Sequence, residues 1–196
     1  MSIIKYFLAL FLAFTACFAN SIFENPTFIK LEEELQKVKT AQGNIAQHIN
    51  GDVTTANFLL AIPGRLRINY PTHKLSLIIN KGVLIYYDEK LNQKSQTINF
   101  NNPFLKSLNQ LSLKGKHYKV TNLTETENEV IILVNFTVEK REETHKIIFT
   151  KNGESFTLNR IEDLTPGSNI YLIFSNIKIN NPLPANSFAI QNTKID

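Results

Sequence analysis

The side chains that most often carry out chemistry are scattered along this sequence. Its four histidines are far apart and none begins a spacing that metal sites use; they are His48, His73, His117 and His145. The sequence has neither a glycine-rich phosphate loop nor the G-x-S-x-G turn of serine hydrolases. We therefore expect no catalytic residues, no bound metal and no cofactor, in a protein that is not an enzyme.

Acidic residues cluster at three places, residues 32–34, 125–129 and 139–143, and lysine or arginine often stands nearby. Such runs of mixed charge are typical of solvated helix and loop faces. An acid pair that the fold assembles from distant parts of the chain stays open at this stage.

The N-terminus has the pattern of a secretory signal peptide. Lys5 supplies a positive charge, residues 6–14 are apolar, and residues 15–19 are mostly small. The apolar run is shorter than the ~20 residues that a helix needs to cross a bilayer. We therefore expect cleavage after Ala19 and export of the remaining chain from the cytoplasm.

Cys17 allows a second interpretation of this segment. Phe14-Thr15-Ala16-Cys17 is similar to a degenerate lipoprotein box, in which cleavage before the cysteine is followed by its acylation. Cleavage after Ala19 would instead leave a mature chain without cysteine, and so without disulfides or thiol chemistry. The two interpretations differ in whether the mature protein is free or tied to a membrane.

The remainder, residues 20–196, has the length of one domain. Without Lys5, 20 lysines and arginines face 17 aspartates and glutamates, a net charge of +3 that is spread along the chain. A nucleic-acid-binding protein typically has a basic stripe, which this sequence lacks. No later apolar run is long enough to cross a membrane. We expect a soluble, monomeric, single-domain protein that binds no nucleic acid.

Two short helices and many strands are expected in this domain. Asn25 can cap a helix from residue 26 to about residue 39, and residues 102–113 repeat the pattern. Alternation and turns predict strands at residues 43–49, 53–62, 65–70, 75–79, 83–87, 95–100, 118–123, 129–139, 144–150, 156–161 and 169–177. The pattern indicates a mainly β (α+β) fold, with helices packed against a curved or barrel-like antiparallel sheet.

Three of these strands carry more apolar residues than one face of a sheet needs, at residues 58–62, 77–79 and 83–87. One explanation is a sheet core that the helices cover. The other is a concave pocket for an apolar ligand, with the helices as its lid. Burial of an acyl chain there is worth about 0.8 kcal/mol per CH₂. Periodicity alone leaves both explanations open.

Five segments stand in an order and spacing that a known family shares. Residues 62–70 (IPGRLRINY) are similar to its R-P-G-R-F-R-W-x-Y segment, and residues 77–88 (LIINKGVLIYYD) to its L-I-V-S-D-G-K-T-L-W-x-Y-D hairpin. Residues 102–105 fall at its short T-P-L helix, and residues 177–188 are similar to its N-x-P-L-P-x-x-x-F closing segment. With the opening helix, these segments resemble the periplasmic outer-membrane lipoprotein carrier proteins, the LolA-type chaperones.

The resemblance implies an unclosed antiparallel β-barrel covered by a lid of short helices, whose cavity holds the acyl chains of lipoproteins. It also implies partners: acylated lipoproteins, an inner-membrane lipoprotein-releasing ABC transporter, and an outer-membrane lipoprotein acceptor. The protein would then be a soluble periplasmic chaperone that makes and breaks no bond itself.

Alternation on the matching strands gives the cavity residues that we expect. They are Leu60, Ile62, Leu66, Ile68, Tyr70, Ile85 and Tyr87. The family has an arginine at the position of Ile62, where it holds the lid by hydrogen bonds. Here either Ile62 seals the lid by packing or the lid opens more readily. Two tryptophans of the family pattern are likewise replaced, by Ile68 and Ile85.

Two other functions fit the same sequence. An outer-membrane-tethered lipoprotein acceptor of similar fold would require an acylated Cys17. A non-catalytic extracytoplasmic structural or adhesive β-protein would have ordinary core, and no cavity, at residues 54–88.

The intact mass of the mature protein distinguishes the carrier from the tethered acceptor. We expect a chain that starts at Asn20 and carries no lipid, because cleavage after Ala19 removes the only cysteine. Cys17→Ser is the control, since it should leave the mature mass unchanged. A diacylated Cys17 at the N-terminus, seen by mass spectrometry, would contradict the carrier interpretation.

Overall fold

The structure is a computed structural model of the chain, and it describes residues 21–80, 82–97, 111–114, 118–138 and 141–189. The expected signal peptide, with Cys17, lies outside these ranges, as does most of the helix expected at residues 102–113. Residues 111–113 of that expected helix are described and are not helical.

Alternating apolar residues and tight turns give eleven strands in the described part of the chain, and these confirm the expected strands with small shifts at their ends. Their bounds are β1 (Thr40–Ile49), β2 (Asp52–Ala61), β3 (Arg65–Tyr70), β4 (Leu75–Asn80), β5 (Val83–Asp88), β6 (Gln93–Thr97), β7 (Tyr118–Glu125), β8 (Glu129–Val138), β9 (Arg141–Asn152), β10 (Ser155–Asp163) and β11 (Ile170–Ile179).

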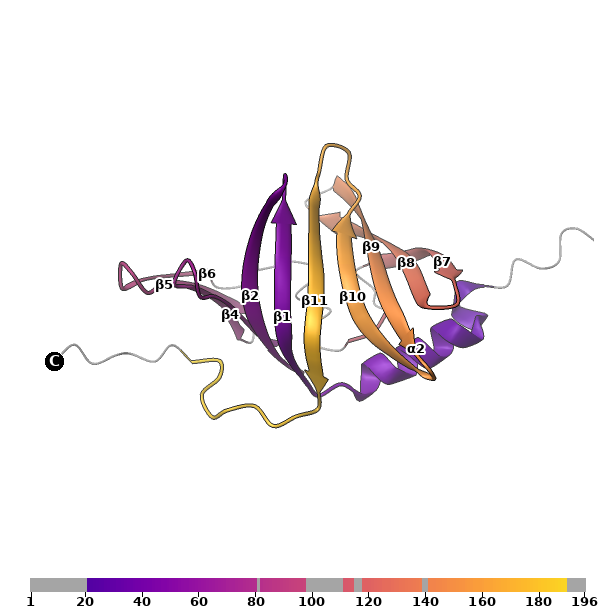
Figure 1. The fold of residues 1–196 in the computed structure, drawn as a ribbon, viewed down its shortest axis with the longest axis horizontal. Helices are drawn as coiled ribbons and strands as arrows, with labels where there is room; N and C mark the ends of the chain where they lie inside the picture. The colour runs from indigo at the N-terminus through magenta and orange to yellow at the C-terminus, as the bar shows by residue number, and fades with distance from the viewer. Residues whose placement is uncertain (1–20, 81, 98–110, 115–117, 139–140, 190–196) are drawn as a thin grey trace, which may run out of the picture.

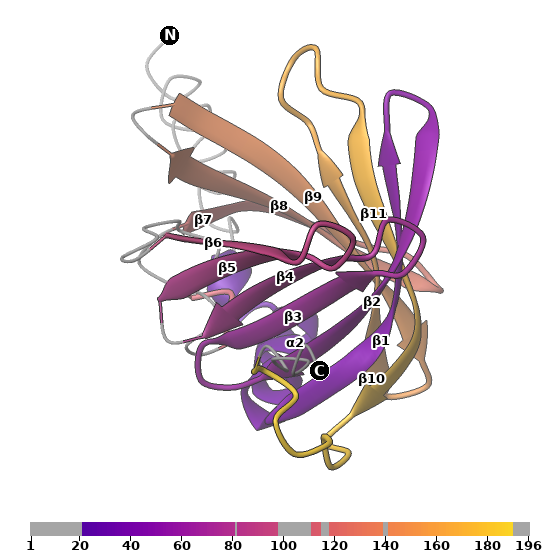
Figure 2. The same ribbon diagram turned by 90° about the vertical axis from the view of Figure 1, so that its left-hand side faces the viewer.

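These strands form one antiparallel sheet in the order β6-β5-β4-β3-β2-β1-β11-β10-β9-β8-β7. Pairing of β1 with β11 joins two halves that are otherwise built from neighbours in sequence. The edge strands β6 and β7 lie on opposite sides of the molecule (Figure 1). The turned view shows how strongly the sheet curves (Figure 2). The fold is thus a mainly β, unclosed antiparallel barrel with a helix, as the sequence predicts.

Helix α2 (Pro26–Lys37) lies beside the β7–β10 half of the sheet (Figure 1) and follows a short 3-10 helix, η1 (Ile22–Glu24). Helix α2 begins at Pro26 with Asn25 as its N-cap, as the sequence predicts. The Asn25 side chain accepts hydrogen bonds from the backbone N–H groups of Thr27 at 2.9 Å and Phe28 at 3.2 Å. Phe28 and Leu31 are 0% and 1% exposed, so these side chains anchor the helix to the sheet.

Most of the buried apolar side chains among the described residues fall into two clusters. The first, called the helix cluster, joins α2 to β7, β8 and β9, and consists of Phe28, Leu31, Leu113, Val120, Val130, Ile132, Val134 and Phe149. The second, called the strand cluster, lies mainly on β1 and β2, and consists of Val38, Ala41, Ile45, Ala56, Phe58 and Leu60. Side chains of β3 and β11 that pack against the strand cluster are only partly buried. The helix therefore completes one half of the core.

Replacement of Asn25 with alanine tests how α2 is held. The variant loses the acceptor of two backbone N–H groups, so we expect the free energy of unfolding to fall by about 1 kcal/mol. Asn25→Asp keeps a capping oxygen and is the matched control. Urea titrations followed by circular dichroism measure both variants, and an equal loss in the two would contradict the role of the cap.

Candidate functional site

The register of β2, β3, β4 and β5 places apolar side chains in rows across one face of the sheet. We call this the inner face, because it carries the strand cluster. One row consists of Phe58, Ile68, Leu77 and Tyr86, and the next of Leu60, Leu66, Ile79 and Leu84. Since paired residues of neighbouring strands share a face, the two rows form one apolar surface across four strands.

Strands β1 and β11 extend the inner face towards the helix cluster. Ile45 is paired with Ala56 on β2 and with Phe174 on β11. Phe58 contacts Phe174 edge-on, with ring centroids 5.8 Å apart. Gly43 lies opposite Phe58, and a Cβ atom there would come within 3.0 Å of the Phe58 ring. Glycine at this position thus leaves the space that Phe58 occupies.

The apolar rows remain accessible on β3 and β5. Leu66 and Ile68 are half-buried, and Tyr86 is 43% exposed. In the helix cluster, by contrast, Val130 and Ile132 are 0% exposed. Apolar side chains that remain accessible to solvent on the inner side of a curved sheet are suited to contact an apolar ligand.

Five of the seven predicted cavity residues lie together at the inner face. Leu60 belongs to the strand cluster itself. The other four pack against that cluster and are half-buried; they are Ile62, Leu66, Ile68 and Tyr70. The structure therefore brings these five side chains to one apolar surface.

Ile85 and Tyr87 lie on the outer face instead, which corrects this part of the prediction. Ile85 is paired with Ile78 and Tyr87 with Ser76, on the side of the sheet opposite to Tyr86. Alternation could not place them, because residues 83–87 are apolar on both faces. The pairing of Asn80 with Val83 sets the register of β5, and the turn signal in the sequence at residues 80–82 could have placed them.

Ile62 stands at the position of the arginine in the family pattern. Its side chain packs against the strand cluster, and its backbone N–H donates to the carbonyl oxygen of Lys39 at 2.9 Å. The side chain itself has no hydrogen-bonding group. Ile62 therefore holds its surroundings by packing.

Tyr70 adds a polar group to the inner face. Its hydroxyl donates a hydrogen bond to Oε1 of Gln47 on β1 at 3.0 Å. Burial raises the pKa of Tyr70, so the phenol is neutral near pH 7 and remains a donor. Because the hydroxyl is satisfied, Tyr70 contributes its ring to the apolar surface without an unpaired polar group.

Glu32 is a buried acid that the sequence analysis missed. It was expected on a solvated helix face, yet it is 3% exposed. Its Oε1 accepts hydrogen bonds from Nε2 of Gln36 at 2.8 Å and from the hydroxyl of Ser112, and its Oε2 accepts one from the N–H of Leu113 at 2.7 Å. The missed signal is helical spacing, since Glu32 stands four residues after Phe28 on the same stripe of α2.

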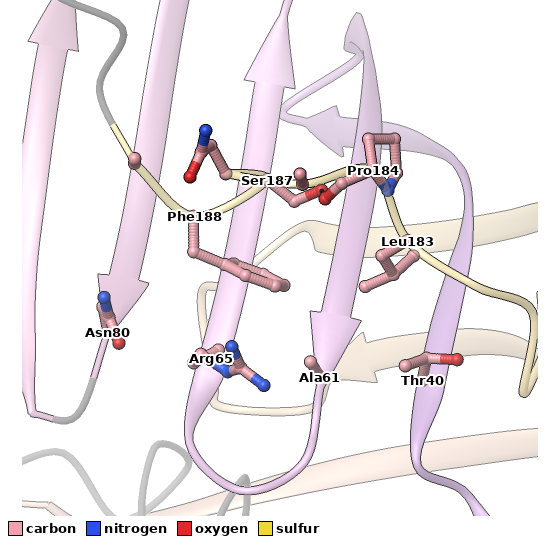
Figure 3. Close-up of a pocket in the computed structure, with 11 residues that line it drawn as sticks. Thr40, Ala61, Arg65, Asn80, Leu183, Pro184, Ser187 and Phe188 are labelled. Atoms are coloured by element: carbon pink, nitrogen blue, oxygen red, sulfur yellow. Dashed lines mark hydrogen bonds between the residues drawn. The ribbon is translucent and has the colours of Figure 1, made fainter.

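A pocket of about 540 Å³ lies between the outer face of the sheet and the chain segment of residues 183–189 (Figure 3). Arg65 and Asn80 line it from the sheet, and the Arg65 guanidinium lies 5.2 Å from the ring centroid of Phe188. Arg67 donates to the Ser187 carbonyl oxygen at 3.3 Å and so fastens the segment. Its partly polar walls and its position on the outer face separate this pocket from the apolar inner face.

The inner face supports hydrophobic binding. Its rows consist of leucine, isoleucine, phenylalanine and tyrosine, which gain free energy when an apolar ligand displaces water. Within the described ranges, no group of three or more histidine, cysteine or acidic side chains could hold a metal ion. No helix in the described part of the chain is both long and apolar enough to cross a membrane.

The comparison with solved structures gives matches of low sequence identity, and those with a TM-score above 0.5 share the fold. An uncharacterized conserved protein from Thermus thermophilus is 10% identical with a TM-score of 0.56, and the match covers 86% of this chain and 93% of that one. A DUF1329 family protein from Desulfovibrio piger is 10% identical with a TM-score of 0.51, over 83% and 95% of the two chains. A LolA superfamily protein from Nitrosomonas europaea is 13% identical with a TM-score of 0.46, over 84% and 96%.

Comparison with curated protein sequences gives no significant match. The sequence does match the family of the outer membrane lipoprotein carrier protein LolA over residues 35–191. That range is most of the chain and contains all the strands described above, including the four that carry the apolar rows. The chain therefore belongs to the outer membrane lipoprotein carrier protein LolA family.

Proposed function

We propose that this protein is a soluble periplasmic chaperone that binds the acyl chains of lipoproteins released from the inner membrane and carries them to the outer membrane. Family membership supports the proposal. The observation that carries it is the apolar surface across β2, β3, β4 and β5, which lies outside the helix cluster and remains accessible on β3 and β5.

The dimensions of this surface suit an acyl chain. Four neighbouring strands span about 14 Å, and the two apolar rows run across all four. Each methylene group that moves from water to such a surface contributes about 0.8 kcal/mol. Even partial coverage of a lipid chain would then hold it in solution.

The proposed carrier is not an enzyme and acts as a monomer. An inner-membrane lipoprotein-releasing ABC transporter loads it, and an outer-membrane acceptor takes the cargo because it binds the cargo more tightly. A periplasmic location requires export, for which residues 1–19 are the expected signal.

Spheroplasts that contain labelled lipoproteins provide the direct test. We expect the purified mature protein to release these lipoproteins into the supernatant as soluble complexes. A carrier that is known to act on the same spheroplasts is the positive control. Absence of release while this control succeeds would contradict the proposal.

Leu66→Glu tests the inner face in the same assay. A carboxylate among apolar side chains opposes contact with an acyl chain, so we expect release to fall about tenfold or more. Ile68→Glu, on the same face, should act alike. Leu59→Glu is the matched control, because Leu59 lies on the outer face of β2 opposite Arg67, where a carboxylate is favourable. Normal release by a folded Leu66→Glu variant would contradict the placement of the site.

Tyr86→Ala and Tyr87→Ala test which side of β5 binds the ligand. Tyr86 lies in an apolar row, and its loss should weaken the binding of a fluorescent fatty acid about fivefold. Tyr87, on the outer face, hydrogen-bonds to Asn92 at 3.1 Å, and its replacement should leave the affinity unchanged. A loss of affinity confined to Tyr87→Ala would place the ligand on the other face.

A further inference from the structure

Residues 111–114 link the two apolar clusters. Leu113 is 7% exposed within the helix cluster, whereas Leu111 packs against the strand cluster. The segment is neither helix nor strand. Its two leucines therefore contact different halves of the core, and the segment lies at the border between them.

Besides the apolar packing of Leu113, helix α2 holds this segment by polar contacts. Glu32 accepts hydrogen bonds from the hydroxyl of Ser112 and from the N–H of Leu113. The ammonium group of Lys114 lies 5.9 Å from the ring centroid of Phe28, in range of a cation–π contact. Three consecutive residues of the segment thus contact the helix.

The buried carboxylate of Glu32 depends on these donors. A charged group is costly to remove from water unless hydrogen bonds replace its hydration. If the segment moved away, Gln36 on the same helix would be the remaining partner among those that the structure shows. Withdrawal of the segment therefore leaves Glu32 short of partners until water reaches it.

We propose that Glu32 is a positioning residue, which keeps Leu111 on the strand cluster and so controls how readily an acyl chain reaches that surface. The inference rests on the proposed function. Leu111 and an acyl chain compete for the same apolar surface, so a bound chain requires Leu111 to withdraw and the bonds of Glu32 to the segment to break. The apparent affinity of the carrier is then its intrinsic affinity multiplied by the fraction of molecules in which the segment is withdrawn.

This competition suits a protein that must give its cargo up. When the segment returns, Leu111 reoccupies the strand cluster and Glu32 regains its donors. Both changes stabilise the empty state relative to the loaded one. Glu32 would thus weaken binding and speed release.

Titration of the purified mature protein with BODIPY-labelled palmitate tests the inference. Glu32→Ala removes the acceptor of the segment's hydrogen bonds, and we expect it to bind about tenfold more tightly than the wild type. Glu33→Ala removes the same charge from an exposed neighbouring position. Asn25→Ala weakens α2 without contact to the segment. Both controls should bind as the wild type does.

Two further variants keep the test decisive if Glu32→Ala fails to fold. Ser112→Ala removes one hydrogen bond to Glu32 and leaves its charge in place. Leu111→Ala removes the competing side chain itself. We expect each to tighten binding about threefold, less than the loss of all bonds at once.

The outcomes separate the inference from the proposed function. If the wild type binds palmitate and Glu32→Ala binds no more tightly than Asn25→Ala, the inference is wrong and the proposed function stands. Weaker binding by Leu111→Ala would also overturn it, because Leu111 would then be part of the binding surface. If the wild type binds no palmitate while an established lipid carrier does, the proposed function fails and the inference with it.

Discussion

The apolar surface on the inner face of the sheet is larger than the area that the one described α-helix, of 12 residues, covers. The burial of side chains over the two halves of the sheet follows from this difference. Over the half of the sheet beside α2, Val130 and Ile132 are completely buried. On the other half the same alternation continues through Leu66 and Ile68, which are half-buried. Partly exposed apolar rows of this kind are a liability in a protein that binds nothing. The proposed carrier function gives them a use.

The two halves of the sheet meet where the start of β1 pairs with the end of β11. Asn180, just after β11, accepts a hydrogen bond from the N–H of Lys39 at 2.7 Å and donates one to the carbonyl oxygen of Lys37 at 3.2 Å. Its φ of 59° is in the left-handed region, which asparagine tolerates better than most residues. These bonds tie the end of α2 to the centre of the sheet. They fix the point from which α2 extends over the β7–β10 half.

Features that depend on a few neighbouring residues could be predicted from the sequence. The cap at Asn25 and the alternation of residues 65–70 are local signals, and the structure confirms the helix and the strand. No local pattern shows which side chains of β5 face inward, because Leu84 and Ile85 are both apolar. Only the pairing register with β4 places them on different faces. Burial of Glu32 depends on a segment 80 residues away in sequence, which no local pattern reveals.

The hydrogen-bonding chemistry of Glu32 matters for the proposed carrier function. A carboxylate only accepts hydrogen bonds, and one of its partners is the backbone N–H of Leu113, which every residue except proline would supply. Once the segment leaves, the carboxylate stays on α2 next to an apolar surface, where an unpaired charge is costly. Under the proposed function, the loaded state must therefore admit water to Glu32, and this cost favours delivery of the cargo over its retention.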